Sequence, residues 1–174
     1  LSMSEGFHPK PRIGFPSALA LGVEGLGEVV ELELAEELSP ADLLSRLQAD
    51  DQPGLSIQSV HRLPDGFGKA QLSRSNYQIS IVDSEDIDKV DRAIGEFKNR
   101  PTVSVTRKGK TLTVDARSQV PELDIRDRHL HLVLAASDAA SLRPTDILEL
   151  LGLQDWISRG AAIIRTGVTL QREF

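Results

Sequence analysis

Short runs of alternating apolar and polar residues recur along this chain, and they constrain its fold more than any other feature. They occupy residues 28–34, 55–63, 77–81, 130–136 and 161–170. Alternation with a period of two is typical of a strand that buries one face. Residues 103–105 and 112–114 also flank the basic stretch Arg107-Lys108-Gly109-Lys110, which predicts a hairpin with a basic tip.

Three segments have apolar residues at helical spacing, at residues 40–49, 84–98 and 144–151. Ser39 and Ser84 stand at the expected N-cap positions of the first two, and Pro144 opens the third. Strands therefore outnumber helices by about two to one. This pattern predicts an α+β fold with ferredoxin-like β-α-β units, a largely antiparallel sheet and helices on one face.

The recurring strand-helix-strand unit predicts two related halves, residues 1–68 and 69–174. The turn sequence Pro64-Asp65-Gly66 lies near the expected boundary. Because Met3 is embedded in the first segment, we expect native residues before Leu1.

Composition excludes several classes of function. The chain has no cysteine, which excludes disulfides, thiolate-bound zinc, iron–sulfur clusters and a cysteine nucleophile. It has no run of roughly 18 apolar residues and no signal peptide pattern, so we expect a cytoplasmic protein without membrane contact. Aromatic residues make up only 4%, so any nucleic-acid binding is expected to be mainly electrostatic.

The net charge of −6 is distributed unevenly. Residues 1–99 hold 9 Lys+Arg against 17 Asp+Glu, whereas residues 100–174 hold 11 against 9. An acidic protein of this kind can still bind a polyanion, but only through a local cationic patch.

The first candidate patch lies in the segment 6–12, which reads GFHPKPR. Its alternating prolines favour an extended chain, and strand alternation would place His8, Lys10 and Arg12 on one side. These cations would be about 6.6 Å apart, a spacing that suits a phosphodiester backbone or an acidic partner surface. The alternative is a proline-stiffened connector with solvated side chains.

The hairpin tip is the second candidate patch. Arg107, Lys108 and Lys110 could supply further phosphate contacts, although charged residues also keep such tips soluble.

No metal, cofactor or catalytic residue is predicted. His129 and His131 share a strand face with Asp127 nearby, but no further ligand can be assigned, and structural metal sites generally need four.

A hydrolase triad is not supported either. His61 could be combined on paper with Ser73, Ser75 and Asp83, but no nucleophile elbow is present. The glycines in residues 22–27 lack the features of a nucleotide-binding loop.

Two motifs carry a resemblance to a known family. Residues 4–12 read SEGFHPKPR, and residues 19–24 read LALGVE. In these motifs, and more loosely at residues 114–117, 143–144 and 164–167, the chain resembles the bacterial radical-SAM-linked domain of unknown function. That family occurs beside radical-SAM proteins or fused to them. The resemblance implies such a protein as partner, in trans or as a fusion, and a native strand and helix before residue 1.

Together these features favour a non-catalytic accessory domain that works with a radical-SAM enzyme and binds RNA or presents a substrate. The candidate binding residues are His8, Lys10, Arg12, Arg107, Lys108 and Lys110. Two alternatives remain open. One is a metal-independent RNA-processing enzyme with His8 as general acid or base, and the other is a protein-docking module that does not contact RNA.

Overall fold

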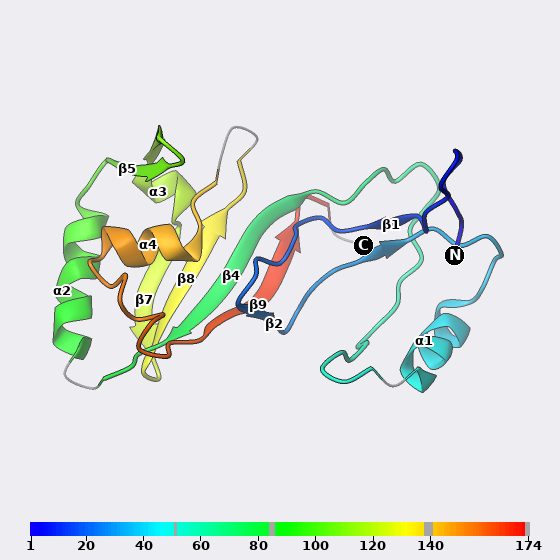
Figure 1. Ribbon diagram of the computed structural model, residues 1–174, viewed down its shortest axis with the longest axis horizontal. Coiled ribbons are helices and arrows are strands. Elements are labelled where there is room, and N and C mark those ends of the chain that lie inside the picture. The colour runs from blue at the N-terminus through cyan, green and yellow to red at the C-terminus, as the bar shows by residue number, and fades with distance from the viewer. Residues whose placement is uncertain (51, 84–85, 138–140, 173–174) are drawn as a thin grey trace. The chain divides into compact units, whose positions relative to one another are not determined.

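The computed structural model describes residues 1–50, 52–83, 86–137 and 141–172 (Figure 1). The chain divides into two compact units, and both are discontinuous in sequence. Unit 1 comprises Leu1–Pro16, Val30–Gln71 and Arg172–Phe174, and unit 2 comprises Ser17–Val29 and Leu72–Gln171. Each unit is described by itself below.

A five-stranded sheet forms the centre of unit 2, with the strand order β2-β9-β4-β8-β7. The strands are β2 (Val23–Gly25), β9 (Ile163–Leu170), β4 (Leu72–Ser80), β8 (His129–Ala135) and β7 (Glu122–Arg126). Neighbouring strands are antiparallel except for β2 and β9, which are parallel. The predicted α+β fold with a largely antiparallel sheet is therefore confirmed.

The core of unit 2 lies on one face of this sheet. In β8 the residues Leu130, Leu132 and Leu134 are buried, as the alternation predicts. The helices α2 (Asp86–Lys98) and α4 (Pro144–Leu150) add apolar side chains to the same cluster. The contributions are Val90, Ile94 and Phe97 from α2, and Ile147 and Leu148 from α4.

The predicted hairpin is confirmed. Strand β5 (Thr102–Arg107) pairs with β6 (Lys110–Asp115) in an antiparallel register, and the short helix α3 (Ala116–Gln119) follows. Lys108 and Gly109 form the turn between them, with φ values of 48° and 75°. Two consecutive positive φ values match the twist of a two-residue hairpin turn.

The helices were largely predictable, because their signals are local. Helix α1 (Pro40–Ala49) has the predicted bounds, and the Ser39 hydroxyl accepts a hydrogen bond from the Asp42 amide at 3.1 Å. Helix α4 ends one residue before the predicted end. The predicted N-cap of α2, Ser84, lies outside the described residues.

Unit 1 has little regular structure besides α1. Strand β1 (Ile13–Gly14) pairs with β3 (Glu31–Leu32), which is all that forms of the strand predicted at residues 28–34. The strand predicted at residues 55–63 is wrong, because that segment forms no strand and Leu55 makes only an isolated bridge with Gln52. The side chain of Gln48 donates instead to the carbonyl of Ile57 at 2.9 Å.

None of the described residues of unit 1 is buried, and helix α1 has no buried side chain. Its leucines are half-buried, whereas Phe15 and Leu55 are exposed. Ordering the backbone costs about 1–2 kcal/mol per residue, which must be offset mainly by apolar burial. Unit 1 is therefore the less stable part of this chain.

We expect hydrogen exchange to separate the two units. Backbone amides of α1 and β3 should exchange through local opening of low free energy, whereas those of β4 and β8 should approach the protection set by global unfolding. Hydrogen exchange followed by mass spectrometry measures this directly. Equal protection of α1 and β8 would contradict the assignment.

Candidate functional site

The segment that contains the first predicted patch folds back on itself as a narrow hairpin. The amide of Ser4 donates to the carbonyl of Lys10 at 2.8 Å, and the amide of Arg12 donates to the carbonyl of Ser2 at 2.9 Å. The Lys10 amide also donates to the Ser4 hydroxyl at 3.0 Å. Gly6, with a φ of 127°, lies in the loop at the end of this hairpin. We call residues 2–12 the N-terminal hairpin.

The three predicted cations of this hairpin differ in environment. His8 lies in the bend of the loop, outside the paired part of the hairpin. The alternation expected of a strand therefore applies only to Lys10 and Arg12, which lie on either side of Pro11. The side chains of His8 and Lys10 are exposed and have no hydrogen bond or ion pair with any described residue. Arg12 instead forms an ion pair with Glu33 at 3.1 Å. His8 and Lys10 are therefore the two side chains of this set that are available for binding.

Phe7 is a feature of the hairpin that the sequence analysis missed. Its side chain is fully exposed at the loop, directly before His8. An exposed aromatic ring beside a cation offers a face on which a base can stack. The detectable signal was an aromatic residue between Gly6 and Pro9, both of which favour loops.

Arg107 lies at the end of β5, and its guanidinium reaches α4. It forms an ion pair with Asp146, and it also donates to the carbonyl of Ser141 at 3.0 Å. Asp146 also accepts the amide of Arg143, which caps the start of α4. The side chain of Arg107 is only 26% exposed, so it ties the hairpin to α4. Lys108 and Lys110 remain exposed at the tip.

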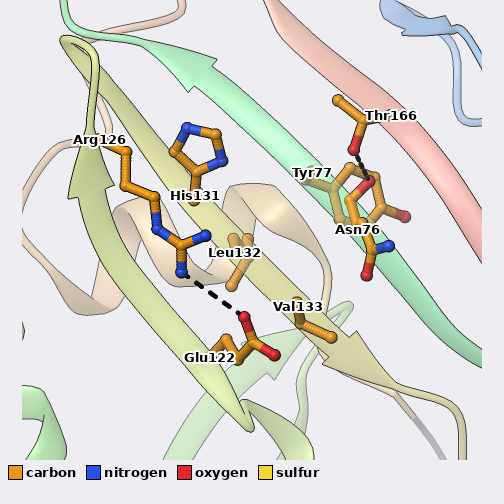
Figure 2. Close-up of a pocket in the computed structure, with 8 residues that line it drawn as sticks. All are labelled: Asn76, Tyr77, Glu122, Arg126, His131, Leu132, Val133 and Thr166. Atoms are coloured by element: carbon orange, nitrogen blue, oxygen red, sulfur yellow. Dashed lines mark hydrogen bonds and ion pairs between the residues drawn. The ribbon is translucent and has the colours of Figure 1, made fainter.

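The face of the sheet in unit 2 opposite the buried leucines carries mostly polar side chains. A hollow of about 240 Å³ lies on this face, and Figure 2 shows it between Glu122 and Arg126 on one side and Asn76 on the other. The full lining is Asn76, Tyr77, Glu122, Arg126, His131, Leu132, Val133 and Thr166. This hollow was not predictable from the sequence, because its lining combines residues from four strands.

Charges around the hollow are nearly balanced. Arg126 forms ion pairs with Asp124 at 2.6 Å and with Glu122 at 3.7 Å. The hydrogen bond to Asp124 raises the pKa of Arg126 above its usual range, and the charges of Asp124 and Glu122 add to this effect. The guanidinium therefore stays charged, and both carboxylates compete with a phosphate for it.

Two polar atoms beneath this face have no partner among the described residues. They are Oδ1 of Asp124 and Nε2 of His131, and both are buried. Asp124 and His131 are register partners in the β7–β8 pair. Because buried polar atoms are nearly always hydrogen-bonded, this place has unused hydrogen-bonding capacity.

The residues considered for a metal or a triad do not assemble into either site. Nδ1 of His129 lies 2.7 Å from the carbonyl oxygen of Asp127. Within the described ranges, no group of three His, Cys, Asp or Glu side chains could hold a metal ion.

For the triad, Ser75 is buried in β4, whereas His61 belongs to unit 1. Ser73 and Asp83 also belong to unit 2.

A buried arginine positions the segment 17–29 in unit 2. The guanidinium of Arg165, on β9, forms an ion pair with Glu28. It also donates to the hydroxyl of Ser17 at 3.0 Å and to the carbonyl of Ala18 at 3.3 Å. The hydrogen bond with Glu28 raises the pKa of Arg165 above its usual range. This cluster therefore fixes the segment beside β9.

Comparison with known families gives one match. Residues 1–144 match the family described as "Uncharacterized protein conserved in bacteria (DUF2344)". The chain belongs to this family. No curated protein and no solved structure matches the chain. No helix in the described part of the chain is long and apolar enough to cross a membrane.

The range that matches the family contains most of the candidate residues. It includes the N-terminal hairpin, Lys108, Lys110 and every residue of the hollow except Thr166. Strand β9, with Arg165, lies beyond it.

Proposed function

We propose that this chain is a non-catalytic accessory domain that binds RNA and works with a radical-SAM enzyme, in trans or as a fusion. The family match supports a bacterial domain, and the sequence motifs in residues 4–12 and 19–24 suggest the enzyme partner. RNA binding is inferred from the surface chemistry of the N-terminal hairpin.

The observation that carries the RNA proposal is the exposed loop with Phe7, His8 and Lys10. An aromatic face can stack on any base, while an adjacent cation contacts the phosphate backbone. Phe7 is fully exposed, and neither His8 nor Lys10 is engaged with another described side chain. This combination suits single-stranded RNA better than a purely electrostatic patch does.

The hairpin tip in unit 2 supplies a second contact. Lys108 and Lys110 are exposed there, whereas Arg107 is engaged by Asp146 and is left out of the proposed surface. Since the chain as a whole carries a charge of −6, such binding depends on local patches and should weaken steeply with salt. Arg12 serves mainly to hold the hairpin through Glu33.

Two substitutions in the N-terminal hairpin should weaken RNA binding in different ways. Lys10→Ala should reduce the salt slope of the affinity by about one, because one phosphate contact is lost. Phe7→Ala should lower the affinity by about 1–3 kcal/mol with the salt slope nearly unchanged, because stacking releases no counterions. Fluorescence anisotropy with a labelled single-stranded oligoribonucleotide at several salt concentrations measures both effects.

Lys89→Ala is the matched control, because Lys89 is an exposed lysine on α2. It should change neither quantity. If Lys10→Ala and Phe7→Ala both bind like the wild type, the hairpin is not the RNA contact. If the wild type cleaves the oligoribonucleotide and His8→Ala does not, the chain is an RNA-processing enzyme instead.

The enzyme partnership is tested separately. Co-expression with a radical-SAM protein from the same bacterium should yield a complex that survives size-exclusion chromatography. A complex that forms without any RNA binding would favour the pure docking module. Failure to form a complex at micromolar concentrations would remove the radical-SAM part of the proposal.

A further inference from the structure

The hollow on the sheet face of unit 2 has hydrogen-bonding groups on two facing sides. Figure 2 shows Glu122 and Arg126, from β7, on one side and Asn76, from β4, on the other, with His131 between them. The hydroxyl of Thr166 donates to the backbone carbonyl of Asn76 at 3.3 Å. The side-chain amide of Asn76 has no hydrogen-bond partner among the described residues, so its donors and acceptor are free.

The charge of the hollow decides against an anion. Its lining has one carboxylate, Glu122, and one guanidinium, Arg126, which form an ion pair at 3.7 Å, and Asp124 on the same strand also pairs with Arg126 at 2.6 Å. A phosphate placed here would compete with both carboxylates for Arg126, whereas a neutral group with N–H donors would meet the carboxylate acceptor of Glu122. The hollow therefore differs in kind from the cationic loop of unit 1.

The size of the hollow selects a single ring system. Its volume of about 240 Å³ lies below the range of roughly 300–1,000 Å³ typical of pockets for drug-sized ligands. Val133 adds an apolar contact to the lining. A flat heterocycle with polar edges fits these requirements, whereas a whole nucleotide with its charged phosphate does not.

We propose that this hollow holds one unpaired RNA base that carries an exocyclic amino group, as adenine does. The inference rests on the proposed RNA binding. The amide of Asn76 offers a donor and an acceptor together, the arrangement that pairs with adenine, and the Glu122 carboxylate accepts from an amino group. Uracil has a carbonyl where adenine has the amino group, so Glu122 would face an acceptor.

Oligonucleotides of one base type test this proposal. Labelled oligoadenylate and oligouridylate of equal length are titrated at one salt concentration and followed by fluorescence anisotropy. We expect the wild type to prefer oligoadenylate by about tenfold, the discrimination of one good base contact. Asn76→Ala and Glu122→Gln should each remove most of this preference and leave the affinity for oligouridylate unchanged.

Gln78→Ala is the matched control, since Gln78 lies on β4 two residues from Asn76 and does not line the hollow. It should keep the preference. The fluorescence of Trp156, the single tryptophan, verifies that each variant is folded. Equal affinity of the wild type for both oligonucleotides, or a preference that survives in both Asn76→Ala and Glu122→Gln, would overturn the proposal.

Failure of RNA binding itself gives a different result. If neither oligonucleotide binds, calorimetric titration with free adenosine and uridine tests whether the hollow binds a base. If adenosine binds more tightly than uridine, and Asn76→Ala abolishes this difference, the hollow is a base site although the chain does not bind RNA. Absence of binding to both nucleosides would end this inference together with the RNA proposal.

Discussion

Replacing Glu28 by Gln should lower the free energy of unfolding of unit 2 by about 3–5 kcal/mol. The side chain of Arg165 is only 2% exposed, and Glu28 is its ion-pair partner. A guanidinium cannot lose its proton in a protein, so removal of the carboxylate leaves a buried charge without an ion-pair partner. Urea unfolding followed by the fluorescence of Trp156, which is buried in unit 2, measures the change.

A double-mutant cycle shows whether the pair itself is responsible. Glu28→Gln combined with Arg165→Met should cost much less than the sum of the single substitutions, because the unpaired charge is then absent. Glu24→Gln is the control, since Glu24 is exposed on β2. If Glu28→Gln lowers the free energy of unfolding no more than Glu24→Gln does, the ion pair between Glu28 and Arg165 does not stabilise the segment 17–29.

Asp146→Asn should destabilise unit 2 by about 3 kcal/mol. Its carboxylate accepts from the Arg107 guanidinium and also from the amide of Arg143 at the start of α4. The substitution removes the charge partner of a partly buried arginine and weakens a helix cap in one step. Thermal unfolding monitored by Trp156 fluorescence gives the effect.

The same experiment distinguishes cations with a structural role from cations with a binding role in the β5–β6 hairpin. Lys108→Ala should change the free energy of unfolding by less than about 0.5 kcal/mol, because Lys108 is exposed. Its proposed role is in RNA affinity alone. Wild-type stability of Asp146→Asn would show that Arg107 is held by its other contacts and not by the ion pair.

The parts of the fold that could be predicted from sequence are those with local causes. Helix α1 follows from the cap at Ser39 and the proline at residue 40, and the β5–β6 hairpin follows from Gly109 between two alternating runs. Both structures are specified by residues close together in the chain.

The remaining elements depend on partners that are distant in sequence. Strand β2 exists because it pairs with β9, about 140 residues later. Strand β7 follows a short helix, and the sequence analysis missed it because its alternation is brief. Conversely, residues 55–63 alternate as a strand does but form no strand, and only Leu55 makes a bridge, to Gln52. Periodicity alone cannot show whether a neighbouring strand is available for pairing.

The candidate residues show the same limit. The sequence correctly predicted the hairpin that carries Arg107, but it could not show that Asp146, 39 residues away, engages the charge of Arg107. Arg12 is engaged by Glu33 in a similar way. The hollow was not predictable either, because Asn76, Glu122 and His131 are brought together only by strand register.

The parallel pair of β2 and β9 has a consequence for the order of folding. Because segment 17–29 is held by β9 and by Arg165, it has no place in unit 2 until most of the chain has left the ribosome. Contacts at such sequence separation raise the contact order, and closing the long intervening loop slows their formation. During synthesis, the side chain of Val23, which packs against the core in the folded unit, therefore remains open to chaperones and to other nascent chains.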